Sequence, residues 1–403
     1  MSTSILYHGF GVYGYKYKKT EYRNGTIVFH IEKSDDKRVC VECGSDNVIK
    51  KGRFVRELRT VPIGGKLVFL AVHLHRHLCM ECGALKQERI GLSDPRRRWT
   101  KALGRYVLSL MRFATVKDVA RHLGMSWDTI KEIRKKALEM KFKRRKVRHI
   151  EYIGVDEIAV RKGHNYLTVV VDLESGEVVW ACEGRDNTAL EPFLRRLKRA
   201  GARIKGIAMD MWPAYIKAAL ECFSSKVIVF DRYHIISDYH RMLDKLRRLE
   251  ASAAPKALKD VYKGVRYLLL KGGEKIEEGT KARHKLDQLL ELNQSLNTAY
   301  IMKEDLRHLW DCDTLAQAKD YLDNWIQKAW SSGIGLLDKF GNRLASHRTG
   351  ILNYFKHRIT TGKVEGINNK IKVLKRKAYG FRDVEYFKLR IYNLHESRYA
   401  LIG

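Results

Sequence analysis

The sequence predicts a mixed α/β protein in three parts: a β-rich module at residues 1–95, a helical module at 96–149 and an α/β domain at 150–403. Two closely spaced cysteine pairs among strand-like runs indicate the first part. A helix, a glycine turn and a second helix indicate the middle part. Alternating strand-like and helix-like runs indicate the last part, which a strand-poor, helical insertion interrupts at about residues 236–358.

The charge balance of the chain predicts a polyanionic partner. Of its 403 residues, 78 are Lys or Arg and 46 are Asp or Glu, which gives a formal net charge of +32. The basic residues are spread through the whole chain, so nucleic acid is favoured over an anionic membrane surface. No apolar run is long enough to span a membrane, and the N-terminus lacks the pattern of a secretory signal. Three of the seven cysteines are scattered, which favours a reducing, intracellular compartment.

The first part contains two CxxCG motifs that are separated by 35 residues. Two such pairs can place four thiolates tetrahedrally around one Zn²⁺, and the glycine after each pair permits a tight turn. Four protein ligands leave no open position, so we expect a structural zinc; the alternative is two unrelated thiol pairs. Alternating histidines at 73, 75 and 77 are either spare ligands or one exposed face of a hairpin, and we favour the exposed face. The expected ligands are Cys40, Cys43, Cys79 and Cys82. The expected strands are Thr26–Ile31, Phe54–Val61 and Lys66–Leu74.

The second part has the pattern of a helix-turn-helix. Leu103–Phe113, Val116–Leu123 and Trp127–Met140 have helical spacing, and a tight turn at Gly124–Ser126 precedes the last of them. The third helix would enter the major groove. The alternative is a plain helical linker bundle, but the basic setting favours contact with DNA. The residues expected to contact DNA are Arg96, Arg97, Arg98, Ser126, Trp127, Thr129, Lys131, Lys143, Arg144 and Arg145.

Residues 150–235 alternate between strand-like and helix-like runs. The expected strands are Glu151–Ala159, Tyr166–Asp172, Glu177–Cys182, Ile204–Asp210 and Lys226–Phe230, and the expected helices are Leu190–Ala200 and Trp212–Cys222. The order β-β-β-α-β-α-β is that of the ribonuclease H-like fold, in which three antiparallel strands lead into parallel strands with helices packed on the sheet. The following stretch is helical, and its expected helices include Lys256–Leu269. A helix that begins near Thr360–Gly362 and a final helix at Asp383–Tyr399 complete the domain.

Three acidic residues occupy positions that suit a metal site. Asp156 and Asp210 each close a short apolar run, and Glu365 begins a basic helical segment. Carboxylates on a rigid frame suit Mg²⁺ or Mn²⁺. Two such ions, roughly 3.5–4 Å apart, can activate water or a 3′-hydroxyl and stabilise the leaving oxygen at a DNA phosphate. The alternative for each acid taken alone is a solvated strand end. Glu157 is expected to point to the other side of its strand and is not counted as a ligand.

Basic and aromatic residues surround these acids. A run of basic residues after Glu365 would form a phosphate track beside it, comprising Lys370, Lys372, Lys375, Arg376 and Lys377. Trp212 either stacks on an unpaired base or is a core tryptophan. Asp231 and His234 either add a polar contact near the site or serve as a helix cap and a helix face, and we favour the cap.

Four runs carry a resemblance to a known family: Gly154–Glu157, Met209–Tyr215, Asp231–His234 and Glu365–Phe381. They resemble the ISL-three family of insertion-sequence transposases, over nearly the whole chain and in the same order. That family carries a zinc-binding ribbon, a helix-turn-helix and a DDE catalytic domain. The resemblance implies that the three acids are a catalytic, metal-binding triad and that the four cysteines bind zinc. It also implies that the substrate is the terminal inverted repeats of a mobile element.

The sequence therefore predicts a DNA transposase that binds terminal inverted repeats and catalyses metal-dependent strand cleavage and strand transfer. Expected cofactors are two Mg²⁺ (or Mn²⁺) ions per active site and one structural Zn²⁺. Expected partners are the inverted repeats, target DNA and a second copy of the chain, in the cytoplasm of a prokaryote at the nucleoid. The alternative is a zinc-dependent DNA-binding regulator that is catalytically silent. A nuclease that acts on RNA–DNA hybrids would use the same acids, but the DNA-reading modules argue against it.

Overall fold

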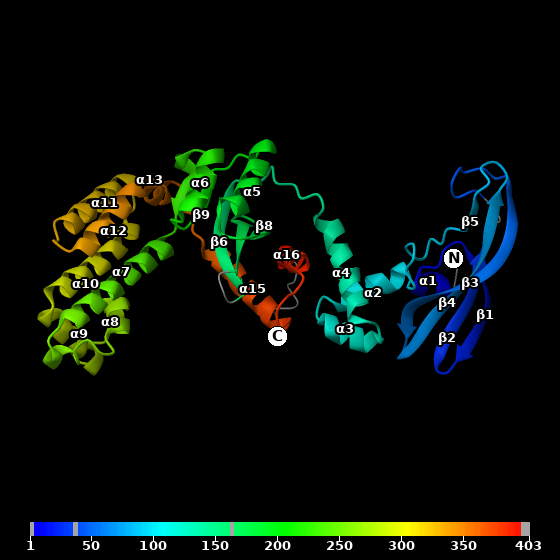
Figure 1. Cartoon of the computed structure of the whole chain (residues 1–403), viewed down its shortest axis with the longest axis horizontal. Coiled ribbons are helices and arrows are strands. Elements are labelled where there is room, and N and C mark those ends of the chain that lie inside the picture. The colour runs from blue at the N-terminus through cyan, green and yellow to red at the C-terminus, as the bar shows by residue number, and fades with distance from the viewer. Residues whose placement is uncertain (1–3, 35–38, 162–164, 396–403) are drawn as a thin grey trace. The chain divides into compact units, whose positions relative to one another are not determined.

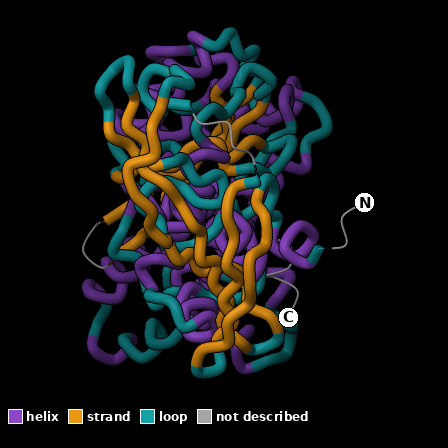
Figure 2. Tube along the Cα trace, turned by 90° about the vertical axis from the view of Figure 1, so that its right-hand side faces the viewer, coloured by secondary structure: helices purple, strands orange, loops and turns teal. Residues whose placement is uncertain are grey.

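The chain divides between Lys141 and Phe142 into two units, each built on its own sheet (Figures 1 and 2). The structure, a computed structural model, describes residues 4–34, 39–161 and 165–395. The predicted domain boundaries near residues 95 and 149 stay predictions. In the described part of the chain, no helix is both long and apolar enough to cross a membrane.

The sheet of the N-terminal unit has the strand order β1-β2-β4-β3, with β5 paired to β4. The elements are α1 (Ile5–Phe10), β1 (Tyr15–Arg23), β2 (Thr26–Lys33), β3 (Val48–Ile63), β4 (Lys66–Cys79) and β5 (Leu85–Gln87). Alternate residues of β4, from Val68 to Leu74, form the core together with Leu58 and Phe10. The sequence interpretation missed α1 and β1, and β3 and β4 are longer than expected. β1 is polar and buries none of its side chains fully, so it shows no alternation.

Three helices follow in the N-terminal unit, as expected: α2 (Lys101–Leu110), α3 (Val116–Leu123) and α4 (Trp127–Phe142). Thr115 and Asp118 form a capping box at the start of α3, and Gly124 ends it with a positive φ of 56°. The hydroxyl of Ser126 accepts a hydrogen bond from the amide of Thr129 at the start of α4. Arg59 of β3 donates to the carbonyls of Leu123 and Gly124, which ties the turn to the sheet of the same unit.

The sheet of the C-terminal unit has the order β10-β9-β6-β7-β8. Its elements are β6 (Tyr152–Arg161), β7 (Asn165–Asp172), β8 (Val178–Glu183), α5 (Asn187–Arg199), β9 (Gly206–Met209), α6 (Pro213–Cys222) and β10 (Ile228–Phe230). β6, β7 and β8 are antiparallel neighbours, and β9 and β10 run parallel to β6. Helices α5 and α6 pack on one face of the sheet. The opposite face packs against α15 (Gly362–Lys377) and α16 (Val384–Tyr392). The expected succession of strands and helices is therefore present.

Between β10 and α15 the chain is helical. The elements are α7 (Arg232–Ala253), a 3₁₀ turn at Lys256–Leu258, α8 (Arg266–Leu270), a 3₁₀ turn at Gly273–Lys275, α9 (Lys281–Leu292), α10 (Gln294–Arg307), a 3₁₀ turn at His308–Asp311, α11 (Leu315–Trp330), α12 (Gly335–Ser346), α13 (Arg348–Leu352) and α14 (Tyr354–His357). The predicted helix Lys256–Leu269 is wrong, because Gly264 adopts a φ of 72° and interrupts it. The final helix ends at Tyr392, and the predicted end at Tyr399 lies outside the described residues.

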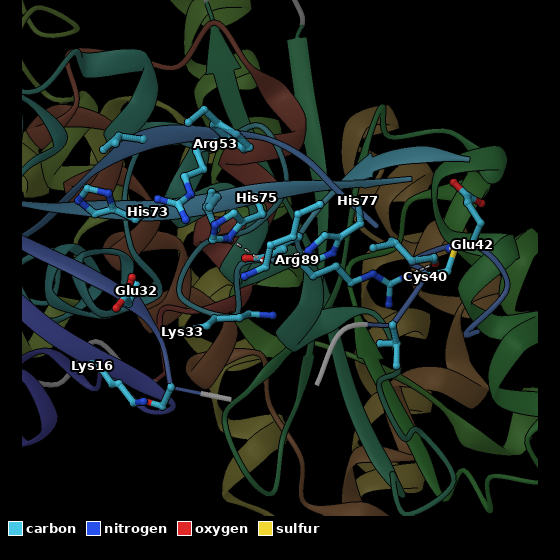
Figure 3. A pocket seen from close by; sticks show the side chains of 18 of the residues that line it. Lys16, Glu32, Lys33, Cys40, Glu42, Arg53, His73, His75, His77 and Arg89 are labelled. Carbon is cyan, nitrogen blue, oxygen red and sulfur yellow. Dashed lines mark hydrogen bonds and ion pairs between the residues drawn. The ribbon is translucent and has the colours of Figure 1, made fainter. Parts of the chain in front are cut away.

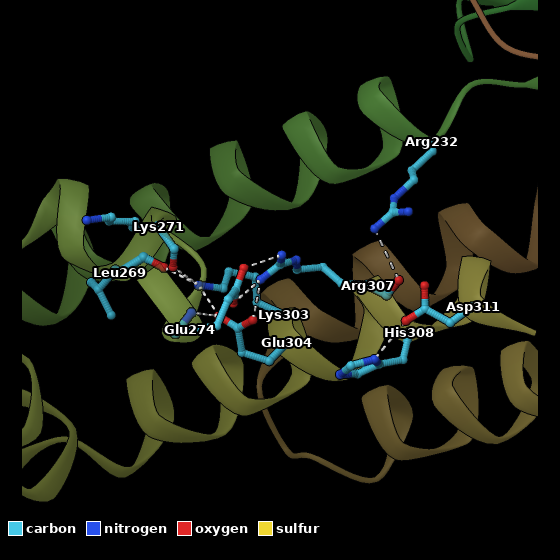
Figure 4. Close-up of polar contacts among 10 residues, drawn as sticks. Arg232, Leu269, Lys271, Glu274, Lys303, Glu304, Arg307, His308 and Asp311 are labelled. Atoms are coloured by element: carbon cyan, nitrogen blue, oxygen red, sulfur yellow. Dashed lines mark hydrogen bonds and ion pairs between the residues drawn. The ribbon is translucent and has the colours of Figure 1, made fainter. Parts of the chain in front are cut away.

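A buried lysine fixes the end of α8, a short helix of this insertion. Lys303 of α10 is 1% exposed, and its ammonium donates to the carbonyls of Leu269 and Lys271 at 2.8 and 2.7 Å (Figure 4). The carboxylate of Glu304 lies 2.7 Å from the same ammonium. Arg307 binds both Glu304 and Glu274 (Figure 4). These contacts satisfy the carbonyls at the end of α8, so this network is structural.

Candidate active site and cysteine cluster

The two aspartates lie level on neighbouring parallel strands. Gly154 of β6 pairs with Ala208 of β9, so Asp210 is the neighbour of Asp156 two residues further along. Side chains alternate along a strand, and Gly154 and Ala208 face the side of the sheet that packs against α15. Asp156 therefore faces that side, and Asp210, the residue after β9, lies near enough for its charge to raise the pKa of Asp156. Adjacent strands are about 4.8 Å apart, so this register brings two carboxylates close together.

The environment of both aspartates disfavours their negative charge. Burial raises the pKa of Asp156, and the charges of Asp210 and Asp231 raise it further. Burial also raises the pKa of Asp210, while the nearby His234 lowers it. The amide of Glu157 donates to Asp156 Oδ1 at 2.8 Å, and the amide of Trp212 donates to Asp210 Oδ1 at 3.0 Å. Two like charges with few compensating donors are a typical setting for a divalent cation.

Helix α15 lies directly against this part of the sheet. A Cβ added to Gly154 would lie 2.4 Å from Cγ2 of Val364, so the helix approaches the strand as closely as glycine allows. One turn later, the side-chain amide of Asn368 donates to Asp156 Oδ2 at 2.8 Å. Glu365 lies between these two contacts, in the first turn of α15, and its side chain is exposed.

The three acids do not form a closed ligand set in this structure. Among the described residues, only the four cysteines bring three or more ligand atoms within 4.8 Å of one another. The side chain of Glu365 is exposed, while the helix that bears it is fixed to Asp156 through Asn368.

Asp231 links the end of β10 to the start of α15. It follows β10 and is the N-cap of α7, where its Oδ1 accepts from the amide of Tyr233 at 2.8 Å. Its Oδ2 accepts from the amide of Thr361 at 2.8 Å and also from the hydroxyl of Thr361. The cap role favoured from the sequence is confirmed.

Glu157 faces the other side of the sheet, as expected. Its strand partner is Thr168, whose hydroxyl is 2.8 Å from the hydroxyl of Tyr215 on α6. Burial, and then the charges of Asp210 and Asp156, raise the pKa of Glu157 to about 7. Glu157 is therefore close enough to Asp156 and Asp210 to be affected by their charges, although it lies on the opposite face of the sheet from Asp156.

Trp212 is bound on one side by protein. Its indole Nε1 donates to the carbonyl of Arg185 at 2.8 Å, and the Arg185 guanidinium lies over its ring, 4.8 Å from the centroid. The same guanidinium lies over Tyr166 at 4.5 Å. The indole packs against the core cluster but is only partly buried, so both sequence interpretations of Trp212 retain support.

The basic residues predicted after Glu365 lie on the outer side of α15. Ile367, Ile371 and Leu374 are buried against the sheet. The basic side chains lie between and beyond these positions and are partly or fully exposed; they are Lys370, Lys372, Lys375, Arg376 and Lys377.

The four cysteines predicted as zinc ligands lie together. The Sγ atoms of Cys40 and Cys82 are 3.6 Å apart, and those of Cys43 and Cys79 are 3.5 Å apart. The glycines that follow each pair have φ angles of 79° and 70°, which confirms their role in the turns. The amides of Cys43 and Glu42 lower the pKa of the Cys40 thiol to about 6, whereas the pKa values of Cys43 and Cys82 are raised by hydrogen bonds among the thiols and by burial. The donor set and its spacing fit a tetrahedral zinc ion.

A basic groove of about 880 Å³ lies beside the cysteine cluster in the N-terminal unit (Figure 3). His75 and His77 face Glu88 at 3.5 and 3.4 Å, and neither belongs to the four-cysteine group found among the described residues. The alternating histidines therefore share one face of the hairpin, but His77 is buried and His73 and His75 are partly buried, so the predicted exposure of this face is wrong. The basic residues of the groove suit a polyanion; they are Lys16, Lys18, Lys33, Lys50, Arg53 and Arg89.

The predicted DNA contacts of the helix-turn-helix fall into two groups. Arg97 binds Glu132 with both guanidinium nitrogens, at 2.8 and 2.6 Å, and Arg145 donates to the carbonyl of Val178 at 2.7 Å and lies over Tyr392. These two guanidiniums are held by protein. The other predicted contacts are exposed or nearly so; they are Arg96, Arg98, Ser126, Trp127, Thr129, Lys131, Lys143 and Arg144.

Two residues at the site were missed from the sequence. Asn368 lies three residues after Glu365, so helical spacing alone places it on a similar face. The link from Asp231 to Thr361 joins residues 130 positions apart, and no local pattern predicts it.

Comparisons with known proteins identify the family of the chain. A transposase family model of the ISL3 type matches residues 153–391, and a model of the helix-turn-helix domain of transposase family ISL3 matches residues 88–136. The transposase for insertion sequence element IS1001 of Bordetella parapertussis is 33% identical over 389 residues, which cover 94% of this chain and 95% of that protein. The transposase for insertion sequence element IS1557 of Mycobacterium tuberculosis is 30% identical over 258 residues, which cover 58% of this chain and 57% of that protein.

Among solved structures, the Drosophila P element transposase strand transfer complex matches with a TM-score of 0.36 at 14% identity, over 73% of this chain and 92% of that chain. The sequence matches alone are decisive, because the catalytic-domain model covers more than half of the chain and the Bordetella relative extends over nearly all of it. The resemblance noted from the sequence is confirmed: the chain belongs to the ISL3 family of transposases.

Proposed function

We propose that this DNA transposase uses Asp156, Asp210 and Glu365 to hold the divalent metal ions with which DNA strands are cleaved and joined. The observation that carries the proposal is the register that puts two partly buried aspartates level on adjacent strands, under the helix that bears Glu365. Burial raises the pKa of both aspartates, and a bound divalent cation would stabilise their ionised form.

The sheet order and the helices on both faces support a ribonuclease H-like domain, interrupted by the helical insertion between β10 and α15. Bound Mg²⁺ or Mn²⁺ would supply an activated water or 3′-hydroxyl and stabilise the leaving oxygen. The protein's own part is to hold the carboxylates and to position the DNA. The exposed basic side of α15 supports a role in binding phosphates next to Glu365.

The N-terminal unit would recognise the terminal inverted repeats. The four cysteines would hold a structural Zn²⁺ beside the basic groove, and the exposed start of α4 would enter the major groove. Because two transposon ends must be joined in one reaction, we expect a homodimer. This function places the protein in the cytoplasm, at the DNA.

Nicking of DNA that carries the element's own inverted repeats tests the proposal. Asp156→Asn, Asp210→Asn and Glu365→Gln should each lower Mg²⁺-dependent nicking by on the order of 10²–10³-fold or more while end binding is kept, because each removes a charge used only in catalysis. Glu183→Gln, at the exposed end of β8, is the matched control and should nick normally. Unchanged nicking and strand transfer by Asp156→Asn would contradict the catalytic role proposed for the three acids. Absence of both activities from the wild-type protein would favour the alternative, a catalytically silent regulator.

A further inference from the structure

Three acids, rather than two, lie level at this edge of the sheet. Phe230 of β10 pairs with Met209 of β9, so Asp231 is the neighbour of Asp210 just as Asp210 is the neighbour of Asp156. The amide of Asp231 donates to the carbonyl of Met209 at 3.1 Å, which fixes the position of Asp231 relative to the end of β9.

The third acid differs from the other two in what its oxygens bind. Asp231 is 6% exposed, and both of its carboxylate oxygens accept hydrogen bonds from protein groups. One oxygen accepts from the amide of Tyr233, and the other accepts from the amide and the hydroxyl of Thr361. A buried carboxylate with these donors is satisfied as an anion and has little capacity left for a metal ion.

The contact with Thr361 reaches the helix that bears Glu365. Thr361 is the residue immediately before α15, and its carbonyl accepts from the amide of Glu365 at 3.0 Å. The hydrogen bonds that Asp231 accepts from Thr361 thus fix the residue whose carbonyl closes the first turn of α15. That turn approaches the sheet again where Val364 lies against Gly154.

We propose that Asp231 is a positioning residue, which holds the first turn of α15 through Thr361 and so fixes Glu365 opposite Asp156 and Asp210. The proposal rests on the metal-binding role proposed for these three acids. Charge-assisted hydrogen bonds that a buried carboxylate accepts are stronger than neutral ones and fix geometry more tightly. Outer partners of metal ligands commonly change metal affinity about 10–100-fold when they are removed.

The test is a titration of the full-length chain with Mn²⁺ in the absence of DNA. Binding is measured as the loss of the electron paramagnetic resonance signal of free Mn²⁺. Thr361→Val keeps the side-chain shape and removes only the hydroxyl donor, and it should weaken Mn²⁺ binding by about 10-fold or more. Thr361→Ser keeps the hydroxyl and should bind as the wild type does. Asp231→Asn removes the charge from the other end of the same contact and should weaken binding as well.

Thr314→Val is the matched control, since Thr314 also precedes a helix but caps α11 in the insertion. It should lower thermal stability and leave Mn²⁺ binding unchanged. Equal binding by the wild type and Thr361→Val, or equal weakening by Thr361→Val and Thr361→Ser, overturns the positioning role.

Glu365→Gln in the same titration separates the two proposals. Weaker Mn²⁺ binding by Glu365→Gln together with full binding by Thr361→Val leaves the proposed function standing and removes the positioning role. Unchanged binding by Glu365→Gln contradicts the metal-binding role of Glu365 itself, and the positioning role is then lost with it.

Discussion

The acidic residues of the catalytic unit acquire different roles from their immediate surroundings. Asp156 and Asp210 are partly open and lack a cationic partner within hydrogen-bonding distance among the described residues, while Asp231 is closed by protein donors. Glu157 faces the opposite side of the same strand, and its Oε2 is buried without a hydrogen-bond partner in the described part of the chain. The cost of this burial makes Glu157 a sensitive probe of the site.

Glu157→Gln should stabilise the metal-free protein at alkaline pH. The pKa of Glu157 is raised from 4.5 to about 7, so between these values the native state binds a proton that the unfolded chain has released. Stability attributable to this group therefore falls as pH rises through that window. The substitution should raise the free energy of unfolding by about 1–3 kcal/mol at pH 8 and by little at pH 4.

Urea unfolding at pH 4, 6 and 8 checks this prediction, with Glu278→Gln as an exposed control that should change nothing. A stabilisation that is the same at all three pH values would contradict it, because a packing effect does not depend on protonation.

Much of the site at residue scale is predictable from the sequence. Alternation along a strand places Asp156 and Glu157 on opposite faces, and the apolar runs before Asp156 and Asp210 predict their positions. The roles of Arg97 and Arg145 are not predictable in this way. Both belong to basic runs that suggest DNA contact, but their guanidiniums bind groups that are distant in sequence.

At the scale of elements, the placement of α15 is the central feature of the catalytic unit. It is held by Asp231 through Thr361, by the close approach of Val364 to Gly154, and by Asn368 on Asp156. The first and last of these are polar contacts. The middle one is steric and depends on the absence of a side chain.

Gly154→Ala should therefore displace α15. The added Cβ would lie 2.4 Å from Val364 and 2.9 Å from Leu173, so the helix must shift. We expect a loss of about 1–3 kcal/mol in stability, typical of overpacking, and a larger loss of strand cleavage than of end binding. Thermal unfolding and the nicking assay measure both effects.

Two further variants make this prediction specific. Val364→Ala combined with Gly154→Ala opens space for the new methyl group and should recover part of the cleavage activity. Gly366→Ala, on the same helix but with no atom near its added Cβ, should instead gain about 0.5–1 kcal/mol. Equal losses for both glycine substitutions would show that steric approach is not the cause.

Elements with strong periodicity were predictable, and those fixed by distant contacts were not. The helices α3 and α11 begin at the threonine caps that the sequence displays. The predicted helix Lys256–Leu269 fails, because the stretch is broken by Gly264 and α8 is held by Lys303 from another helix. β1 was missed because its exposed, polar residues resemble a loop.

At the scale of the whole molecule, the proposed function assigns recognition and catalysis to two units that fold around separate cores. The N-terminal sheet contains the long β3–β4 hairpin, and the cysteine cluster lies at the end of that hairpin where β4 reaches Cys79. The catalytic unit has a larger apolar core and no such cluster among its described residues. The two units should therefore respond differently to chelation.

Removal of zinc by a strong chelator, or Cys40→Ser, should loosen the region around the two CxxC motifs and abolish specific end binding. Structural zinc sites contribute folding free energy directly, so their loss exposes the attached chain. Limited proteolysis should then cut within residues 39–95 while a fragment that includes residues 142–395 stays protected. Cys312→Ser is the control and should leave proteolysis and DNA binding unchanged, because Cys312 lies in the helical insertion and not in the cysteine cluster. Unaltered proteolysis and DNA binding after complete zinc removal would contradict a structural role.

The most direct test of the account is the location of Mn²⁺ in the full chain bound to its own end DNA, by anomalous diffraction. We predict density within about 2.0–2.3 Å of carboxylate oxygens from Asp156 and Asp210, with Glu365 completing the protein ligands. Density at another site, or ions held by the aspartates with the Glu365 carboxylate turned away from them in the DNA-bound state, would contradict it.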